Sequence, residues 1–256
     1  MVDSISTLSD AEVELKALSK QLEENNRILR YIALGPEKIV DFIYNDKHVK
    51  MYLPYADVDR IQAGVAARKT FYEERHLRQI IPLIGPDSVV FDAGANIGNH
   101  TVFFSKICRA AKVISVEVMK QTYSILAKNI EVNGLHGVTA HNVGLGAKAG
   151  YANLVRQSQT NLGNTVVKPE DDGVYEIVSI DSFGLDKLDF LKIDVEGMHL
   201  QVLDGARETL RRCKPLIWLE LRPKYGEYEP GVEKMAELGY REMKKLPPHD
   251  VIFEPA

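Results

Sequence analysis

The chain is poor in cysteine: its 256 residues include two, Cys108 and Cys213, and they do not form a CxxC pair. We therefore expect neither a disulfide framework nor a zinc site, and interpret both as buried free thiols. No run of about 18 apolar residues occurs, and the first residues, MVDSISTLSDAEVEL, carry acids in place of a basic segment. We expect no signal peptide, no membrane span and a cytoplasmic location.

An excess of basic charge is also missing, since the formal net charge is -4. Proteins that bind nucleic acid usually carry a basic field on at least one face. We interpret the local basic clusters, Arg68-Lys69 and Arg75-His76-Arg78, as solvated helix faces. The charge pattern predicts no nucleic-acid partner, and the 45% hydrophobic share allows one substantial core.

The N-terminal segment, residues 1–34, shows apolar residues at heptad spacing. The two rows are Leu8, Leu15, Leu22 and Leu29, and then Ala11, Leu18, Asn25 and Ile32. Such a pattern is typical of a coiled coil, which would make residues 8–32 the seam of a homo-oligomer. The alternative is a single amphipathic helix that lies along its own domain. Gly35-Pro36 ends this helix in either case.

Residues 35–82 are predicted to form a cap over the main domain. The segment IVDFIYNDKHVKMYLPYAD is typical of two short strands, and one helix is expected from about Asp57 to Ile81. Residues 83–256 then alternate strand and helix, which predicts an α/β domain with a mostly parallel sheet and helices on both faces. The expected strands are 89–92, 113–117, 138–143, 190–194 and 216–221, and the expected helices are 99–108, 119–133, 196–212 and 231–238. An insert at 150–180 is expected to be a hairpin with a mobile tip.

The turn after the first core strand, in VVFDAGANIGNH, lacks two features that bound phosphates require. The spacing from Gly94 to Gly98 has no middle glycine for a pyrophosphate, and no P-loop lysine follows. Glycines at these two positions allow backbone to approach a ligand closely. The turn therefore indicates a nucleoside ligand without phosphate, S-adenosylmethionine before NAD or ATP.

Polar residues at the carboxyl ends of the expected strands are the candidate binding residues, because ligands of open α/β sheets gather there. Glu117 lies 19 residues beyond Gly98, where a carboxylate can accept hydrogen bonds from a ribose. The Asp92 carboxylate could attract the cationic side of the ligand. The alternative is that Asp92 caps the turn and Glu117 caps a helix. The set at the strand ends is Asp92, Glu117, Asn142, Asp194 and Glu220.

The strings DAGANIGNHT, FLKIDVEGMHLQVLDGARETL and WLELRP, preceded by FYEERHL, resemble the FkbM family of S-adenosylmethionine-dependent methyltransferases. The resemblance runs from about Tyr72 to Pro223. It implies a Rossmann-like class I fold with a seven-stranded sheet, and methylation of hydroxyl groups on sugars, glycans or polyketide-type natural products. It further implies that Asp92, Gly94, Asn96 and Gly98 form the turn on the methionine side of the cofactor and that Glu117 binds the ribose. Asn142 and Val143 would flank the adenine, and Asp194 would face the methyl group. Tyr72 and Glu73 would close the cofactor pocket.

Two catalytic arrangements remain open. Asp194 could act as a general base, or Asp194 and Glu220 together could hold a divalent cation that binds the substrate oxygen. We favour the metal-free arrangement. Lys192 is a further catalytic candidate, although we favour an ion pair with a neighbouring acid such as Asp181 or Glu220.

Four other polar residues are interpreted structurally. Glu196 is expected to begin a helix, with a substrate contact as the alternative. His199 is expected to be a surface or packing residue, and Trp218 to belong to the core. His100 stands where relatives of the family carry an aromatic residue, and we do not assign it a catalytic role.

The sequence thus predicts an S-adenosylmethionine-dependent O-methyltransferase acting on a hydroxyl of a sugar, glycan or glycosylated natural product. The alternatives are an N- or C-methyltransferase of a small metabolite and a non-catalytic protein that binds an adenosyl ligand. A nicotinamide-dependent oxidoreductase is disfavoured by the glycine spacing.

Overall fold

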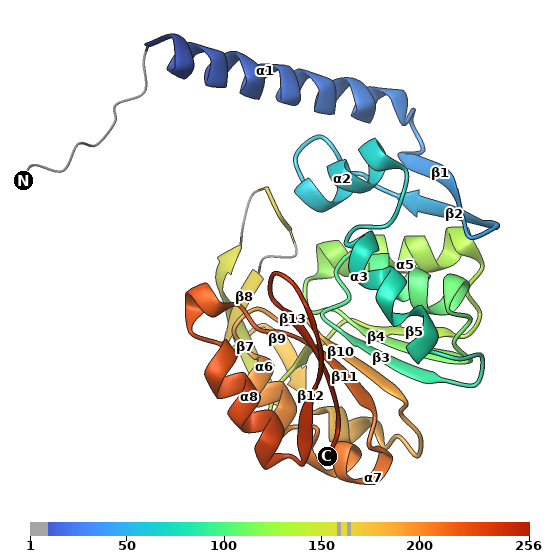
Figure 1. Cartoon of the computed structure of the whole chain (residues 1–256), viewed down its shortest axis with the longest axis vertical. Helices are drawn as coiled ribbons and strands as arrows, with labels where there is room; N and C mark the ends of the chain where they lie inside the picture. The colour runs from blue at the N-terminus through green and yellow to red at the C-terminus, as the bar shows by residue number, and fades with distance from the viewer. Residues whose placement is uncertain (1–9, 158–159, 163–164) are drawn as a thin grey trace, which may run out of the picture.

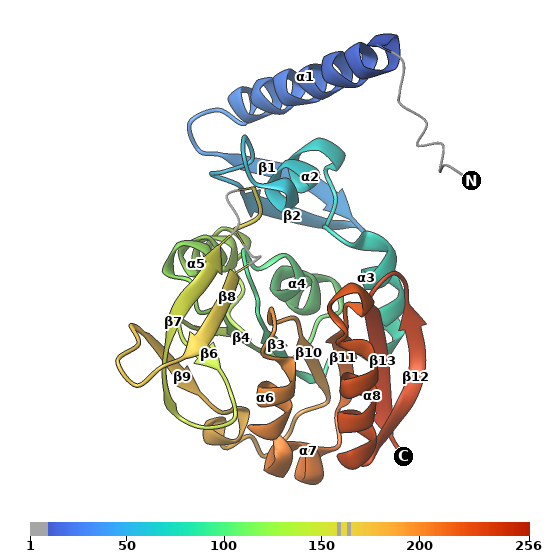
Figure 2. The same cartoon turned by 90° about the vertical axis from the view of Figure 1, so that its left-hand side faces the viewer.

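The structure is a computed structural model that describes residues 10–157, 160–162 and 165–256. Leu8, the first residue of the predicted heptad, lies outside this range. Helix α1 (Asp10–Ala33) projects from the rest of the molecule beyond α2 (Arg60–Arg68), as Figures 1 and 2 show. Across the described ranges, each helix is too short or too polar to span a lipid bilayer.

A seven-stranded sheet forms the centre of the main domain, in the order β12-β13-β11-β10-β3-β4-β5. Five neighbouring strands are parallel, and β13 runs antiparallel to both β11 and β12. This arrangement confirms the predicted mostly parallel α/β fold. The strands are β3 (Val89–Ala93), β4 (Lys112–Val116), β5 (Val138–His141), β10 (Phe190–Ile193), β11 (Leu216–Glu220), β12 (Tyr240–Leu246) and β13 (Asp250–Pro255).

Successive residues of the central strands face opposite sides of the sheet and belong to two different hydrophobic clusters. Phe190 and Trp218 belong to the cluster on the side of the cap, whereas Leu191 and Ile217 belong to the other. Both faces are therefore buried, as continuous apolar strands require. The helices of the domain are α4 (Asn99–Val102), α5 (Lys120–Asn133), α6 (His199–Asp204), α7 (Arg207–Cys213) and α8 (Tyr228–Glu237).

Two predicted helices of the domain are broken. The helix expected at 99–108 has a π-helical segment, Phe103–Ile107, after α4, and Cys108 N donates to Phe103 O across five residues. The helix expected at 196–212 is split into α6 and α7 around Gly205. A side chain at Gly205 would overlap the backbone oxygen of Gly146, and the carboxylate of Asp181 then caps α7 by accepting from two backbone N–H groups.

The cap contains the two expected strands, β1 (Ile39–Tyr44) and β2 (Lys47–Tyr52), but two helices where one was predicted. Asp59 begins α2 by accepting a hydrogen bond from Gln62 N, and α3 spans Glu74–Ile80. Lys69 and Glu73 lie in the break between them, with φ of 48° and 57°. This left-handed conformation usually occurs at glycine, and neither position is a glycine, so the sequence does not indicate the break.

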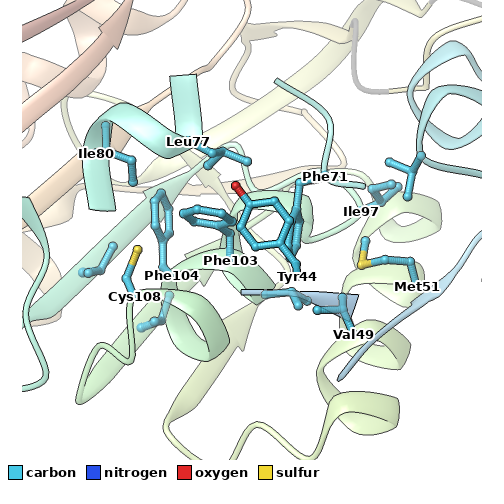
Figure 3. Packing of buried hydrophobic residues seen from close by; sticks show 14 of the residues in the cluster. Tyr44, Val49, Met51, Phe71, Leu77, Ile80, Ile97, Phe103, Phe104 and Cys108 are labelled. Carbon is cyan, nitrogen blue, oxygen red and sulfur yellow. The ribbon is translucent and has the colours of Figure 1, made fainter. Parts of the chain in front are cut away.

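Asparagine side chains join the cap to the domain. Asn129 on α5 accepts from Tyr52 N at 2.6 Å and donates to Ile97 O at 2.8 Å, and Asn133 pairs in the same way with the backbone of Lys50. Figure 3 shows Tyr44 of the cap packed among aromatic residues of the domain. One hydrophobic cluster thus crosses the boundary that we predict at residues 82 and 83.

The insert forms a second sheet of four strands in the order β6-β9-β7-β8. The expected hairpin is present as β7 (Gly150–Gln157) and β8 (Thr165–Pro169), and β6 (Gly144–Leu145) and β9 (Tyr175–Val178) are added to it. Part of its tip lies outside the described residues. The described part contacts the cap, since Leu162 N donates to Asp59 at 2.8 Å.

Candidate functional site

Two cavities open at the carboxyl edge of the parallel strands, where the strand order reverses between β3 and β10. The narrow cavity lies between the end of β4, the segment after β5, and β8, and its lining includes Glu117 and Val143. The wide cavity, about 540 Å³, lies between the cap and the ends of β11 and β13. Gly94, Asp194 and Glu196 line both cavities, so the two cavities meet at these residues.

The glycine turn after β3 adopts the strained backbone that its sequence predicts, but for another reason. Gly94 and Gly98 have φ of 78° and 84°. A Cβ at Gly94 would overlap Asp194 O, and one at Gly98 would lie 2.7 Å from Leu126 Cδ1. Glycine is therefore required by close approach of the chain to itself. Asn96 lines the wide cavity, whereas Gly98 lines neither.

Glu117 ties the turn after β3 to the end of β4. Its two carboxylate oxygens accept hydrogen bonds from Asn96 N and Met119 N, both at 2.9 Å. Burial raises the pKa of Glu117, against the opposing effect of these hydrogen bonds. Each carboxylate oxygen keeps a further lone pair, and the residue lines the narrow cavity. Asn142 supports it from behind by donating to Glu117 O at 2.8 Å.

Asp92 and Lys192 lie behind the cavities. Asp92 is fully buried and accepts from Thr101 Oγ1 at 2.7 Å. The Lys192 ammonium lies 3.0 Å from Asp194 Oδ2 and 4.0 Å from Asp92 Oδ1. Burial opposes the charge of Lys192, but the two carboxylates prevail and raise its pKa. The prediction that Lys192 forms an ion pair is confirmed, but its partners are Asp194 and Asp92. Asp181, one of the expected partners, caps α7 instead.

Asp194 and Glu220, the predicted catalytic carboxylates, are both at the wide cavity. Burial works against the Asp194 charge, but the neighbouring ammonium of Lys192 lowers the pKa of Asp194. Burial and the charge of Asp194 raise the pKa of Glu220. Arg222 lies 3.0 Å from Glu220 and also pairs with Glu196. Cationic side chains already accompany both carboxylates.

The prediction that Glu196 begins a helix is wrong, because α6 starts at His199. Glu196 pairs with Arg222 instead. His199 is buried and Trp218 is fully buried, as expected of packing residues. Trp218 has a polar partner in addition, because its indole Nε1 donates to Asp250 Oδ1 at 2.7 Å.

A group of residues from the cap and from the C-terminal hairpin completes the wide cavity. Glu73 Oε2 lies 3.3 Å from His100 Nε2, and His76 Nδ1 lies 3.6 Å from Asp250 Oδ2. Burial raises the pKa of Glu73, but the neighbouring His100 outweighs it and lowers this pKa. Burial, followed by the charge of Glu73, raises the pKa of Asp250.

Sequence reasoning missed two members of this group. Arg75 and Arg78 are exposed as predicted, but His76 between them is buried at 9% exposure, which corrects the interpretation of the whole cluster as solvated. Asp250 lies beyond the stretch that resembles the family, and it carries no local signal. An i, i+3 spacing from Glu73 to His76 on a helix start is the one pattern that could have pointed to this group.

The fold, with a glycine turn after β3, an acid at the end of β4 and a cavity at the point of strand-order reversal, is the arrangement expected of a class I methyltransferase. The model of the methyltransferase FkbM domain matches residues 92–242, and the chain therefore belongs to the FkbM methyltransferase family. Membership confirms the prediction of a methyltransferase and of S-adenosylmethionine as its cofactor.

Two curated relatives carry the same activity in their names. Methyltransferase sdnD of Sordaria araneosa is 28% identical over 193 residues, which cover 61% of this chain and 73% of the relative. Methyltransferase 1 of Beauveria bassiana is 26% identical over 145 residues, which cover 46% of this chain and 58% of the relative. The match therefore spans less than two thirds of the second relative.

Solved structures with a similar fold include a methyltransferase FkbM from Methylobacillus flagellatus. It has a TM-score of 0.49 and 17% identity, and the similarity covers 67% of this chain and 44% of that chain. The TYW2 protein of M. jannaschii, solved in complex with AdoMet, has a TM-score of 0.43 and 16% identity, over 87% of this chain and 89% of its own.

Proposed function

We propose that the protein transfers the methyl group of S-adenosylmethionine to a hydroxyl oxygen of a small polyhydroxylated acceptor, a sugar, glycan or glycosylated natural product. In this proposal the narrow cavity holds the adenosine and the wide cavity holds the acceptor. The observation that carries it is that Gly94, Asp194 and Glu196 line both cavities. A donor and an acceptor that meet there can be aligned for direct transfer.

The cofactor contacts follow from the narrow cavity. Glu117 accepts from the ribose hydroxyls with the lone pairs that its two backbone partners leave free. Val143 packs against the adenine, and Asn142 fixes the Glu117 segment. The turn from Asp92 to Gly98 carries the methionine end where the two cavities meet, with Gly94 in the lining of both and Asn96 in the lining of the wide one. Asp92 acts through the charge that it contributes behind this turn, since it is fully buried there, with Thr101 on its Oδ2 and Lys192 4.0 Å from its Oδ1.

Methyl transfer needs alignment more than strong acid or base chemistry. The acceptor oxygen attacks the methyl carbon, the bond from that carbon to sulfur breaks, and sulfur leaves as a neutral thioether. Asp194 is the group that orients the acceptor hydroxyl and takes up its proton as the oxygen loses electron density. Lys192 is a positioning residue, because its ammonium holds the Asp194 carboxylate at 3.0 Å.

The lining of the wide cavity supports a hydroxylated acceptor. Carboxylates of Glu73, Asp194, Glu220 and Asp250 can accept hydrogen bonds from several hydroxyl groups. A volume of about 540 Å³ accommodates a molecule of the size of a sugar unit. An N- or C-methyltransferase of a small metabolite is the second candidate, since the cofactor contacts do not depend on the acceptor atom.

Calorimetry with S-adenosylhomocysteine tests the cofactor site. We expect Glu117→Ala to weaken binding by at least about tenfold, because it removes the ribose contact and releases Asn96 N and Met119 N. Glu131→Ala, at a residue whose side chain is 69% exposed, is the matched control and should bind as the unmodified chain does. Equal affinity of the Glu117 variant would remove the ribose assignment, and absence of turnover with every hydroxylated acceptor would favour a non-catalytic binder.

The same proposal includes a second copy of the chain as a partner. The apolar row of α1 is exposed, with Leu15, Leu22 and Leu29 at 68%, 61% and 62%. Lys20 and Arg27, on the opposite face, lie toward α2 instead. A contiguous apolar row on an exposed helix is typical of an interaction surface.

The two free thiols, Cys108 and Cys213, agree with the reducing compartment that we predict.

A further inference from the structure

The wide cavity contains three potential ligand atoms for a cation on two different parts of the fold. They belong to Glu73 and His76, at the start of α3, and to Asp250, the first residue of β13. One ligand atom from each side chain lies within 4.8 Å of the other two. His76 and Asp250 are buried, at 9% and 8% exposure, while Glu73 is partly exposed toward the cavity.

The hydrogen bond on the far side of His76 determines which ring nitrogen faces the group. His76 Nε2 lies 2.7 Å from the carbonyl oxygen of Pro247, and a carbonyl can only accept. Nε2 therefore carries a hydrogen, and Nδ1 is the ring nitrogen that faces Glu73 and Asp250. Nδ1 is buried and has no hydrogen-bond partner among the described residues. A histidine that binds a metal typically donates its other N–H to a backbone carbonyl in this way.

Asp250 is oriented in a similar manner. Trp218 Nε1 donates to Asp250 Oδ1 at 2.7 Å, which leaves Oδ2 directed at His76 Nδ1, 3.6 Å away. A positive group between Nδ1 and Oδ2, either a proton on Nδ1 or a metal ion, stabilises this arrangement. Their separation exceeds a hydrogen bond and is close to the roughly 3.4 Å between two ligands of one tetrahedral Zn²⁺, given Zn–N and Zn–O distances of about 2.0–2.2 Å.

We infer that Glu73, His76 and Asp250 form a binding site for a divalent transition-metal ion in the wide cavity. One imidazole and two carboxylates suit ions such as Zn²⁺ or Mn²⁺ better than Mg²⁺, which prefers oxygen ligands and water. Three protein ligands leave coordination positions open toward the cavity. Such an ion would lower the pKa of an acceptor hydroxyl, a role that rests on the proposed function, whereas binding of the ion does not.

This site differs from the pair that the sequence suggested. Asp194 and Glu220 also line the wide cavity, but Lys192 and Arg222 already supply positive charge to them at 3.0 Å. Glu73 has His100 at 3.3 Å, yet no lysine or arginine within ion-pair distance is described for Glu73 or Asp250 in the ranges that the structure covers. A cation adds more electrostatic stabilisation where carboxylates lack such partners.

Asp250→Asn is the decisive variant, because its shape is nearly unchanged. The amide oxygen can still accept from Trp218 Nε1, so this hydrogen bond is kept while an anionic ligand is lost. His48→Ala is the matched control, because His48 Nε2 pairs with Asp41 at 2.7 Å on the exposed surface of the cap.

The full-length protein is first dialysed against a chelator and then titrated with Mn²⁺, with free Mn²⁺ followed by electron paramagnetic resonance. We expect one bound Mn²⁺ per chain, displaced by Zn²⁺, and the same result for His48→Ala. Asp250→Asn should weaken binding by at least about tenfold without lowering the melting temperature of the metal-free protein. No bound Mn²⁺ in the unmodified chain, or equal binding by Asp250→Asn, would overturn the site.

Calorimetry with S-adenosylhomocysteine on the same metal-free samples separates this inference from the proposed function. If Mn²⁺ binds and S-adenosylhomocysteine does not, the proposed function fails and the ion site stands. The reverse result removes the ion site and leaves the cofactor assignment intact.

Discussion

The backbone of Asp194 occupies the space that a side chain at Gly94 would fill. β3 and β10 are neighbours, and Asp194 N donates to Ala93 O at 3.0 Å, which brings Asp194 O against the Cα of Gly94. The methionine-side turn and the proposed catalytic carboxylate therefore have a fixed relative position. The two residues lie where the cavities meet, so a change at one displaces the other.

We expect Gly94→Ala to damage both stability and cofactor binding. A Cβ would overlap Asp194 O, and φ of 78° is strained for alanine. Together these effects should lower the free energy of unfolding by about 2 kcal/mol or more, and weaken S-adenosylhomocysteine binding at least tenfold. Denaturant titration and calorimetry measure the two quantities. Gly150→Ala is the control, since no described atom lies within 4 Å of the added carbon, and equal results for both variants would contradict the explanation.

Asp194→Asn should separate catalysis from binding. The variant keeps the side-chain volume but loses the anionic group that takes up the acceptor proton. We expect turnover to fall by a factor on the order of 100 or more, while binding of S-adenosylhomocysteine changes a few-fold at most. Asp186→Asn, the same substitution at an exposed residue near the opposite edge of the sheet, is the control. Undiminished turnover would leave alignment as the source of the rate and remove the base assignment.

The sequence predicts those site residues that lie at the carboxyl ends of the parallel strands, because the topology of the sheet brings these strand ends together. Glu117, Asp194 and Glu220 follow three parallel strands, and the carboxyl ends of such strands share one edge of the sheet. The alternating pattern of β10 also indicated that Lys192 needs an acidic partner. It could not select Asp92, because that choice depends on how β3 and β10 align in register. Asp194 lies two residues further along the same segment, where alternation places it on the same face as Lys192.

Residues that depend on tertiary docking could not be predicted. His76 and Asp250 are 174 positions apart in the chain and meet because the cap packs on the C-terminal hairpin. The helix expected from Asp57 to Ile81 was wrong for a related reason, since Lys69 and Glu73 adopt left-handed backbone that favourable packing of α3 stabilises. Apolar periodicity continues through that break, so the pattern alone indicates one helix.

Docking of the cap depends on Asn129, whose amide bridges β2 and the turn before α4. Asn129→Ala would leave Tyr52 N and Ile97 O without their partner. A buried group that loses its hydrogen bond costs about 1–3 kcal/mol, so we expect the free energy of unfolding to fall by about 2 kcal/mol or more. Urea denaturation measures this value. Asn153→Ala, at an exposed pair with Glu170, should change it by less than about 0.5 kcal/mol, and a similar loss in both variants would contradict the bridging role.

The two thiols should differ in reactivity. Burial raises the pKa of Cys108 to about 12, so roughly one molecule in 10⁴ carries the thiolate at pH 8. Cys213 is partly exposed. We expect Ellman's reagent at pH 8 to modify one thiol of the folded protein and both thiols in guanidinium chloride. The folded Cys213→Ser variant should be unreactive, and the rate at Cys108 should rise with pH because the thiolate is the reacting form. Equal rates for both thiols would show that Cys108 is accessible.

The exposed row of α1 predicts a dimer that a single charge can dissociate. Leu22 lies in the middle of the helix at 61% exposure, and a glutamate there would place two unpaired charges in the apolar seam. We expect the unmodified chain to sediment as a dimer at micromolar concentration and Leu22→Glu as a monomer. Lys20→Gln, on the face toward α2, changes the net charge by the same amount; it is the control and should leave the dimer intact. If the unmodified chain sediments as a monomer, α1 is a solitary amphipathic helix, and the heptad does not mediate self-association.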